Sequence, residues 1–174
     1  QAGYDDLDAL RRFADAVDLI SFEFENIPAD ALDVLSAAKP LYPSRVALET
    51  SQDRLTEKTF LADLDLATAP FAPVDSAADL DAALARIGTP AILKTRRFGY
   101  DGKGQARITT REDTGRALAS LNGAPAILEG FVDFSMEISV IAARGRDGAI
   151  ACYDPGQNVH KDGILATTTV PATI

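Results

Sequence analysis

The sequence predicts an α+β fold, with an antiparallel sheet in its central domain and the tail of an α/β domain ahead of it. Two observations lead to this prediction. Residues 1–50 show helix, strand and helix patterns in turn, the order typical of a parallel sheet. Residues 90–153 instead hold short β-rich runs interrupted by one helix, which favours adjacent antiparallel strands. The composition, 47% hydrophobic and 25% charged residues, is that of a globular protein and excludes a disordered or disulfide-scaffold chain.

The first fifty residues contain two expected helices around one expected strand. Apolar residues recur at helical spacing over 7–17, and an apolar run over 17–24 indicates a strand. A second helix is expected at about 28–38, because proline is favoured at a helix start and Asp30 lies in the first turn. One strand with its flanking helices cannot cover both faces of a sheet. We therefore expect residues 1–50 to be the C-terminal part of a larger α/β domain.

Residues 51–75 are expected to form a connection. It begins with an amphipathic helix over 53–64, which Ser51 or Asp53 can cap, and continues as an extended link over 70–74. Residues 76–174 are then expected to form the central domain, which would open with a helix over 77–87 closed by Gly88 and continue as strands with one further helix. The strands are expected at 90–95, 105–109, 126–132, 136–143 and 149–153, and the helix at about 112–121.

The charges are unevenly distributed. Seventeen basic and 26 acidic residues give a net charge of −9, yet one segment is strongly basic and contains a single acid, Asp101. Such a local positive field favours a small anion, whereas the net charge argues against a nucleic-acid partner. The sequence shows no apolar run long enough for a membrane span and no signal-peptide pattern, so we expect a cytoplasmic protein, and Cys152 is expected to be a small buried residue. The basic residues of this segment are Lys94, Arg96, Arg97, Lys103, Arg107 and Arg111.

The most informative pattern lies between two expected strands. Gly99, Gly102 and Gly104 fall within six residues and allow backbone N–H groups to approach an anion, while Lys103 supplies a charge. The pattern differs from a Walker A loop, because no serine or threonine follows the lysine, and from a dinucleotide fingerprint, because a strand is expected after it. The alternative is a glycine-rich hairpin turn. The surrounding cations favour a phosphate-binding loop, which we expect to be mobile over 98–104 without nucleotide.

Four other residues are candidates for a site. Lys94 lies in an apolar strand, where its alternative is an edge-strand lysine pointing to solvent. Glu129 ends another apolar strand before a glycine, where exposed backbone groups could meet a purine edge. Glu137 alternates with apolar neighbours and could belong to a solvated strand face. His160, the only histidine, lies in an expected polar loop, where a surface position is the alternative.

Four blocks together resemble the ATP-grasp enzymes and, more closely, the carboxyaminoimidazole ribonucleotide synthetase (PurK) family. These blocks are 23–26, 52–58, Lys94 with 99–105, and 158–165. The resemblance implies that ATP phosphorylates bicarbonate, and that carboxyphosphate or its CO2 carboxylates the amine of 5-aminoimidazole ribonucleotide in de novo purine biosynthesis. It also implies an ADP-forming ligase that uses ATP and Mg²⁺ and is a homodimer at full length.

The resemblance assigns roles to matching positions. Tyr100 and Lys103 would be catalytic, and Glu25 with Tyr100 would bind aminoimidazole ribonucleotide. Arg54 and Lys94 would hold the ATP phosphates beneath a loop of Gly99, Tyr100, Asp101, Gly102, Lys103, Gly104 and Gln105. An adenine hinge would comprise Glu129, Gly130, Phe131 and Val132, while Glu137 would accept hydrogen bonds from the ribose and His160 would lie beside the nucleotide.

Family members begin earlier than this chain and continue beyond its end. The acidic and asparagine ligands of Mg²⁺ are therefore expected outside this chain, and we expect the 174 residues alone to be inactive. Two alternatives stay open. One is another ATP-grasp carboxylate–amine ligase or the formate-using purine enzyme, against which block 23–26 argues. The other is a non-catalytic nucleotide-binding module that regulates a partner.

Overall fold

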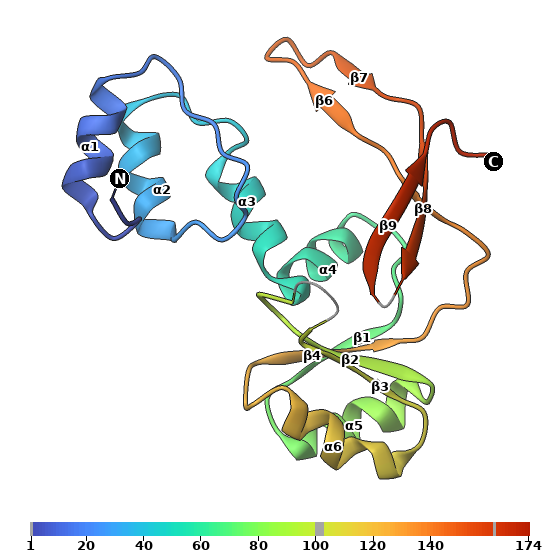
Figure 1. Ribbon diagram of the computed structural model, residues 1–174. Helices are drawn as coiled ribbons and strands as arrows, with labels where there is room; N and C mark the ends of the chain where they lie inside the picture. Colours follow the sequence, from blue (N-terminus) through green and yellow to red (C-terminus); the bar gives the residue numbers. More distant parts are fainter. Residues whose placement is uncertain (1, 100–102, 162) are drawn as a thin grey trace.

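The computed structural model describes residues 2–99, 103–161 and 163–174 of the chain (Figure 1). Along the described chain, a group of helices is followed by a four-stranded sheet with its own helices and then by a β-rich C-terminal part. Among the described helices, none is long and apolar enough to cross a bilayer.

Three helices form the N-terminal part: α1 (Leu7–Asp15), α2 (Ala29–Ala38) and α3 (Arg45–Gln52). The first two agree with the sequence prediction, whereas α3 was not predicted. The strand expected over 17–24 is wrong, because Ile20 forms only an isolated parallel bridge with Leu41. That bridge has two backbone hydrogen bonds, and no described strand lies alongside to extend it. Apolar side chains from the helices and this bridge form one core: Ala14, Ile20, Ile27, Ala31, Leu32, Leu35, Leu41 and Leu48.

The predicted connecting helix is α4 (Arg54–Asp63). Its N-cap is Asp53, whose carboxylate accepts hydrogen bonds from the N–H groups of Leu55 and Thr56. The Ser51 hydroxyl instead donates to a carbonyl within α3. Of the two predicted capping residues, Asp53 is therefore the one that caps α4. Helix α3 therefore ends one residue before the cap of α4.

The central sheet has the order β1-β4-β2-β3, and all its pairs are antiparallel, as predicted. Its strands are β1 (Phe71–Val74), β2 (Ala91–Thr95), β3 (Gln105–Ile108) and β4 (Ala126–Gly130). The segment expected as an extended link over 70–74 is indeed extended, and in addition residues 71–74 form an edge strand of the sheet. Pro73 is tolerated there, since an edge strand can lack one ladder donor.

One face of this sheet packs on helices. Helix α5 (Ala77–Ile87), the short helix η1 (Arg111–Asp113) and helix α6 (Thr114–Ser120) follow the expected positions. Helix α4 and the C-terminal strands lie on the opposite side of the sheet from α5 and α6 (Figure 1). The core between sheet and helices includes Val74, Leu80, Leu84, Leu93, Ile108 and Leu128.

The C-terminal part contains five strands: β5 (Glu137–Ser139), β6 (Ala142–Arg144), β7 (Ile150–Cys152), β8 (Gly156–Lys161) and β9 (Ile164–Thr169). They form the sheet β5-β8-β9 and the hairpin β6-β7.

Three expectations for this part are corrected. The single strand expected over 136–143 is divided between β5 and β6. The polar loop expected around His160 is strand β8, whose polar composition conceals the strand pattern. Cys152 is exposed on β7 instead of buried, because this hairpin has no buried residues.

Candidate functional site

Side-chain alternation on β2 separates a core face from a polar face. Ala91 and Leu93 are buried against the helices, so Ile92 and Lys94 lie on the opposite face. On that face, the Lys94 Nζ donates a hydrogen bond to Oε2 of Glu129 at 2.9 Å. Strand β2 is flanked by β4 and β3, so the edge-strand alternative for Lys94 is wrong. The structure therefore unites two residues that the sequence analysis treated separately.

A second lysine, which the sequence analysis did not select, approaches the same carboxylate. Lys58 of α4 places its Nζ 3.8 Å from Oε2 of Glu129 and 5.8 Å from the ring centroid of Phe71. Glu129 is only 7% exposed, and a buried carboxylate needs such partners. With two ammonium groups and one carboxylate, the cluster has a formal charge of +1. The sequence signal was the spacing of Arg54 and Lys58, which puts both on one face of a helix.

The base of the glycine loop is closely packed against Thr95. The Thr95 N–H donates to the carbonyl of Gly104 at 2.7 Å. Gly104 has a φ of +71°, and a Cβ there would lie 2.6 Å from Oγ1 of Thr95. A Cβ on Gly99 would lie 3.2 Å from the same hydroxyl. Glycine is therefore required at position 104 by both backbone conformation and space.

The middle of this loop carries several predicted roles. Tyr100, Asp101 and Gly102 lie outside the described residues, and so does the main part of the expectation that the loop is mobile. Lys103 is exposed, and Gln105 opens β3 opposite Lys94 in the β2–β3 register.

The expected cluster of unopposed cations is partly neutralised. The Arg96 Nε donates to both carboxylate oxygens of Asp53 at 3.0 Å. The Arg97 Nη2 donates to Oε1 of Gln52 at 2.7 Å. Arg107 lies over the ring of Phe131, 4.4 Å from its centroid. The segment therefore keeps its predicted excess of basic residues, but one of them, Arg96, pairs with Asp53, an acid distant in sequence.

Burial of Asp53 acts to raise the pKa of its carboxyl group. The hydrogen bonds from Arg96, Thr56 and Leu55 outweigh burial and leave this pKa below its ordinary value. Asp53 is thus ionised at neutral pH, and it holds the end of β2 against the start of α4.

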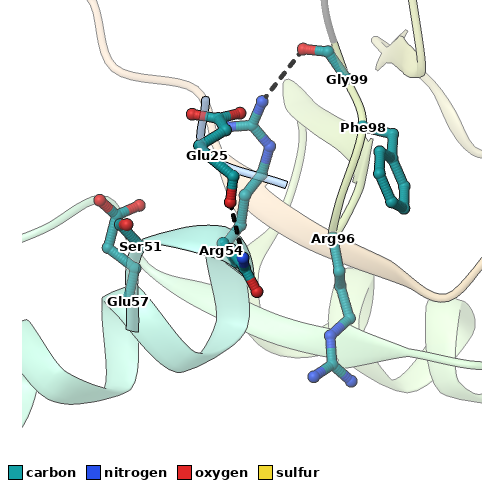
Figure 2. Close-up of a pocket in the computed structure, with 8 residues that line it drawn as sticks. Glu25, Ser51, Arg54, Glu57, Arg96, Phe98 and Gly99 are labelled. Carbon is teal, nitrogen blue, oxygen red and sulfur yellow. Dashed lines mark hydrogen bonds between the residues drawn. The ribbon is translucent and has the colours of Figure 1, made fainter. Parts of the chain in front are cut away.

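Next to this contact lies a pocket of about 350 Å³ (Figure 2). Arg54 extends from the start of α4 into the pocket, where its Nη2 donates to the carbonyl of Gly99 at 3.4 Å. The structure therefore brings Glu25 and Arg54 to one cavity beside the glycine loop, and this polar space has the size of a small-molecule site. Its walls comprise Glu25, Ser51, Gln52, Arg54, Glu57, Arg96, Phe98 and Gly99.

Two further predicted residues meet on the C-terminal sheet. The His160 Nδ1 lies 3.4 Å from Oε1 of Glu137, and the amide of Asn158 donates to the same oxygen at 3.3 Å. Strands β5 and β8 bring them together, because Glu137 is the register partner of Asn158.

The predicted hinge begins within β4, which contains Glu129 and Gly130, and continues beyond the strand with Phe131 and Val132. The N–H groups of Gly130 and Phe131 donate to the carbonyls of Pro70 and Pro90, so neither is available as a donor to a ligand. Val132 is exposed immediately after them.

Comparisons with known proteins agree with this architecture. The family model of the ATP-grasp domain matches residues 59–174, and that of the ribonucleotide synthetase preATP-grasp domain matches residues 1–52. The N5-carboxyaminoimidazole ribonucleotide synthase of Brucella melitensis biotype 1 is 54% identical over 99% of this chain and 48% of its own length.

Two crystal structures show the same fold. The N5-carboxyaminoimidazole ribonucleotide synthetase of Thermus thermophilus has a TM-score of 0.90 and 46% identity, over 99% of this chain and 46% of its own. The synthetase of Staphylococcus aureus complexed with ADP has a TM-score of 0.95 and 36% identity, over 100% and 47%. The chain spans about half the length of each of these three relatives. Its predicted resemblance to carboxyaminoimidazole ribonucleotide synthetases is confirmed, and the chain belongs to the ATP-grasp family.

Proposed function

We propose that the full-length protein carboxylates 5-aminoimidazole ribonucleotide to its N-carboxy derivative, with ATP and bicarbonate as co-substrates and ADP as a product, in purine biosynthesis. One observation carries this proposal. The pocket beside the glycine loop has both Glu25 and Arg54 in its walls. These are the residues assigned to aminoimidazole ribonucleotide and to ATP, respectively. ATP transfers its terminal phosphoryl group to bicarbonate and leaves as ADP, and the carboxyphosphate or its CO2 then carboxylates the amine of aminoimidazole ribonucleotide while phosphate is released. The short-lived intermediate must pass from one site to the other, so the two sites must be adjacent.

The ATP site in this proposal lies on the polar face of the central sheet. Lys94 and Arg54 bind phosphate oxygens, and the +1 charge of the cluster with Lys58 and Glu129 favours an anion there. Residues 99–105 are proposed to fold over the phosphates, because their glycines let backbone N–H groups approach an anion and Lys103 supplies a positive charge. Further along the ligand, the hinge residues 129–132 contact adenine, and Glu137 accepts hydrogen bonds from the ribose hydroxyls. His160 lies beside the nucleotide. The crystal structure of the Staphylococcus aureus relative complexed with ADP supports an adenine nucleotide as a ligand of this fold.

The proposed chemistry is mainly positional and electrostatic. Phosphoryl transfer to bicarbonate needs aligned oxygens and neutralised charge more than covalent help. Lys103, exposed at the end of the loop, supplies a mobile cation for the transferring group. Glu25 accepts hydrogen bonds from aminoimidazole ribonucleotide, and Tyr100 is proposed to contact that substrate and assist the transfer.

Magnesium ion is proposed to accompany ATP. Among the described residues, no group of three or more His, Cys, Asp or Glu side chains is placed to hold a metal ion. Its ligands are proposed to lie outside this chain. The proposal also includes a cytoplasmic homodimer and a division of the chain into 1–50, 51–75 and 76–174.

The decisive experiment measures ADP release by the full-length protein with ATP and bicarbonate, with and without 5-aminoimidazole ribonucleotide. Release that requires the ribonucleotide supports the proposal. Release that requires a different amine or formate indicates another ligase of the family. Nucleotide binding without turnover under any of these conditions indicates a regulatory module.

A further inference from the structure

Gln52, the last residue of α3, makes hydrogen bonds in two directions. Its Nε2 donates to the carbonyl of Glu25 at 2.6 Å and to the carbonyl of Ile27 at 2.8 Å. Its Oε1 accepts from Nη2 of Arg97 at 2.7 Å. One side chain therefore joins the backbone around Glu25 to the residues that lead from β2 into the glycine loop.

The chemistry of the amide determines its orientation. A glutamine amide offers two N–H donors and one carbonyl acceptor, and here two carbonyls and one guanidinium surround it. The reverse orientation would place the amide oxygen against two carbonyl oxygens and the NH2 group against a cation. Only the described orientation gives both the NH2 group and the oxygen of Gln52 a suitable partner. The bridge therefore requires a side chain that donates at one side and accepts at the other.

The next two residues strengthen the same connection. Asp53 pairs with Arg96, and the N–H of Arg54 donates to the carbonyl of Arg96 at 3.0 Å. We refer to residues 52–54 as the α3–α4 junction. It contacts residues 96 and 97 through two side chains and one backbone bond, and Gln52 extends this contact to the backbone of Glu25.

We infer that Gln52 is a positioning residue, which fixes the backbone of Glu25 relative to the strand end that enters the glycine loop. This inference rests on the proposed function, in which Glu25 binds aminoimidazole ribonucleotide and the loop binds ATP. A bridge between two binding segments couples their ligands, because ordering one segment restricts the other. Nucleotide bound under the loop is therefore expected to increase the affinity for aminoimidazole ribonucleotide through Gln52.

The test uses the full-length protein and three variants. Gln52→Leu keeps the approximate size and removes every hydrogen bond of the bridge. Arg97→Gln removes the guanidinium on the loop side and leaves the bonds to the carbonyls of Glu25 and Ile27 in place. Arg116→Gln is the matched control, because Arg116 is an exposed guanidinium on α6. Calorimetry measures the affinity for aminoimidazole ribonucleotide with and without ADP, and steady-state kinetics gives KM for each substrate.

We expect Gln52→Leu to raise KM for aminoimidazole ribonucleotide about tenfold and to leave the Kd for ADP within about twofold. ADP should no longer improve the affinity of this variant for the ribonucleotide. Arg97→Gln should also abolish that improvement, but it should reduce the affinity for the ribonucleotide measured without ADP less than Gln52→Leu does. Arg116→Gln should resemble wild type.

Other outcomes overturn the inference. If the wild type is active and Gln52→Leu changes neither the KM for aminoimidazole ribonucleotide nor its coupling to ADP, the inference is overturned while the proposed function stands. The inference is also overturned if Gln52→Leu weakens ADP binding as much as ribonucleotide binding and lowers the thermal stability as well. Such a result would indicate a general structural role for Gln52. If Gln52→Leu does not fold, normal coupling in Arg97→Gln overturns it. A wild type that does not bind the ribonucleotide contradicts the proposed function, and the inference fails with it.

Discussion

Lys94 on β2 and Glu129 on β4 form an ion pair diagonally across two neighbouring antiparallel strands, with Nζ and Oε2 2.9 Å apart. The register partners are Ile127 for Lys94 and Ile92 for Glu129, so the two side chains are offset by two residues. That offset leaves the carboxylate within 3.8 Å of Lys58 on α4. Glu129 therefore holds two cations near each other on the face proposed to bind phosphate.

Replacing Lys94 tests the phosphate site. Removing a charged hydrogen bond of about 1.5–3 kcal/mol should weaken ATP binding by roughly 10- to 150-fold in Lys94→Ala. Calorimetry of the full-length protein measures this change, with Lys39→Ala at the end of α2 as a control lysine. An unchanged dissociation constant would remove Lys94 from the nucleotide site.

Replacing Glu129 tests the charge balance of the cluster. Glu129→Gln leaves two ammonium groups without their shared anion, which should reduce the free energy of unfolding by about 1–3 kcal/mol. Urea unfolding measures it, and adding Lys58→Met should restore part of the loss. Asp8→Asn, which breaks an exposed ion pair with Arg11, should change stability little. If Lys58→Met added its own full cost instead, the two residues would not interact.

Replacing Gly104 tests the loop geometry. Gly104→Ala must adopt a positive φ and place a methyl group 2.6 Å from Oγ1 of Thr95, so we expect a loss of about 1–2 kcal/mol in stability. Gly115→Ala in α6 is the matched control. It meets no atom within 4 Å and should stabilise the helix by about 0.5–1 kcal/mol. Equal effects of the two alanines in thermal unfolding would contradict the close packing described at Thr95.

The pKa of Asp53 predicts an acid sensitivity. A carboxyl group whose pKa is lower in the folded state stabilises the fold above its unfolded pKa, and this contribution is lost as the pH falls through the folded pKa. The free energy of unfolding should therefore decrease below about pH 4. Asp53→Asn should be less stable than wild type at neutral pH and should show a shallower decrease. Urea unfolding between about pH 6 and pH 3 measures both slopes. Parallel curves for the two proteins would exclude a contribution from Asp53.

Helices with clear amphipathic patterns were predictable, and so was the antiparallel central sheet. The exception among the helices is α3, in which Leu48 is buried but Val46 is 69% exposed, so its apolar pattern is too sparse to detect. Strand β8 was missed because polar residues occupy both its faces. The run over 17–24 has the composition of a strand, but strand formation depends on neighbours that local sequence does not specify.

The candidate site was predictable where chemistry is local. Glycines and cations close together in sequence identified the loop. Lys94 and Glu129 were identified separately, because each is a charged residue in an apolar strand. Their pairing could not be predicted, because it depends on strand register across 35 residues of sequence. The contacts of Gln52 and Lys58 were also missed, since each partner lies on a distant element.

The α3–α4 junction also determines where this protein can be cut. Family matches divide the chain between residues 52 and 59, which suggests a nucleotide-binding part beginning near residue 59. A truncation at that point would remove Gln52 and Asp53 and leave the side chains of Arg96 and Arg97 without these acceptors. A separately expressed part should instead start before Ser44, the N-cap of α3, so that the whole helix supports the junction.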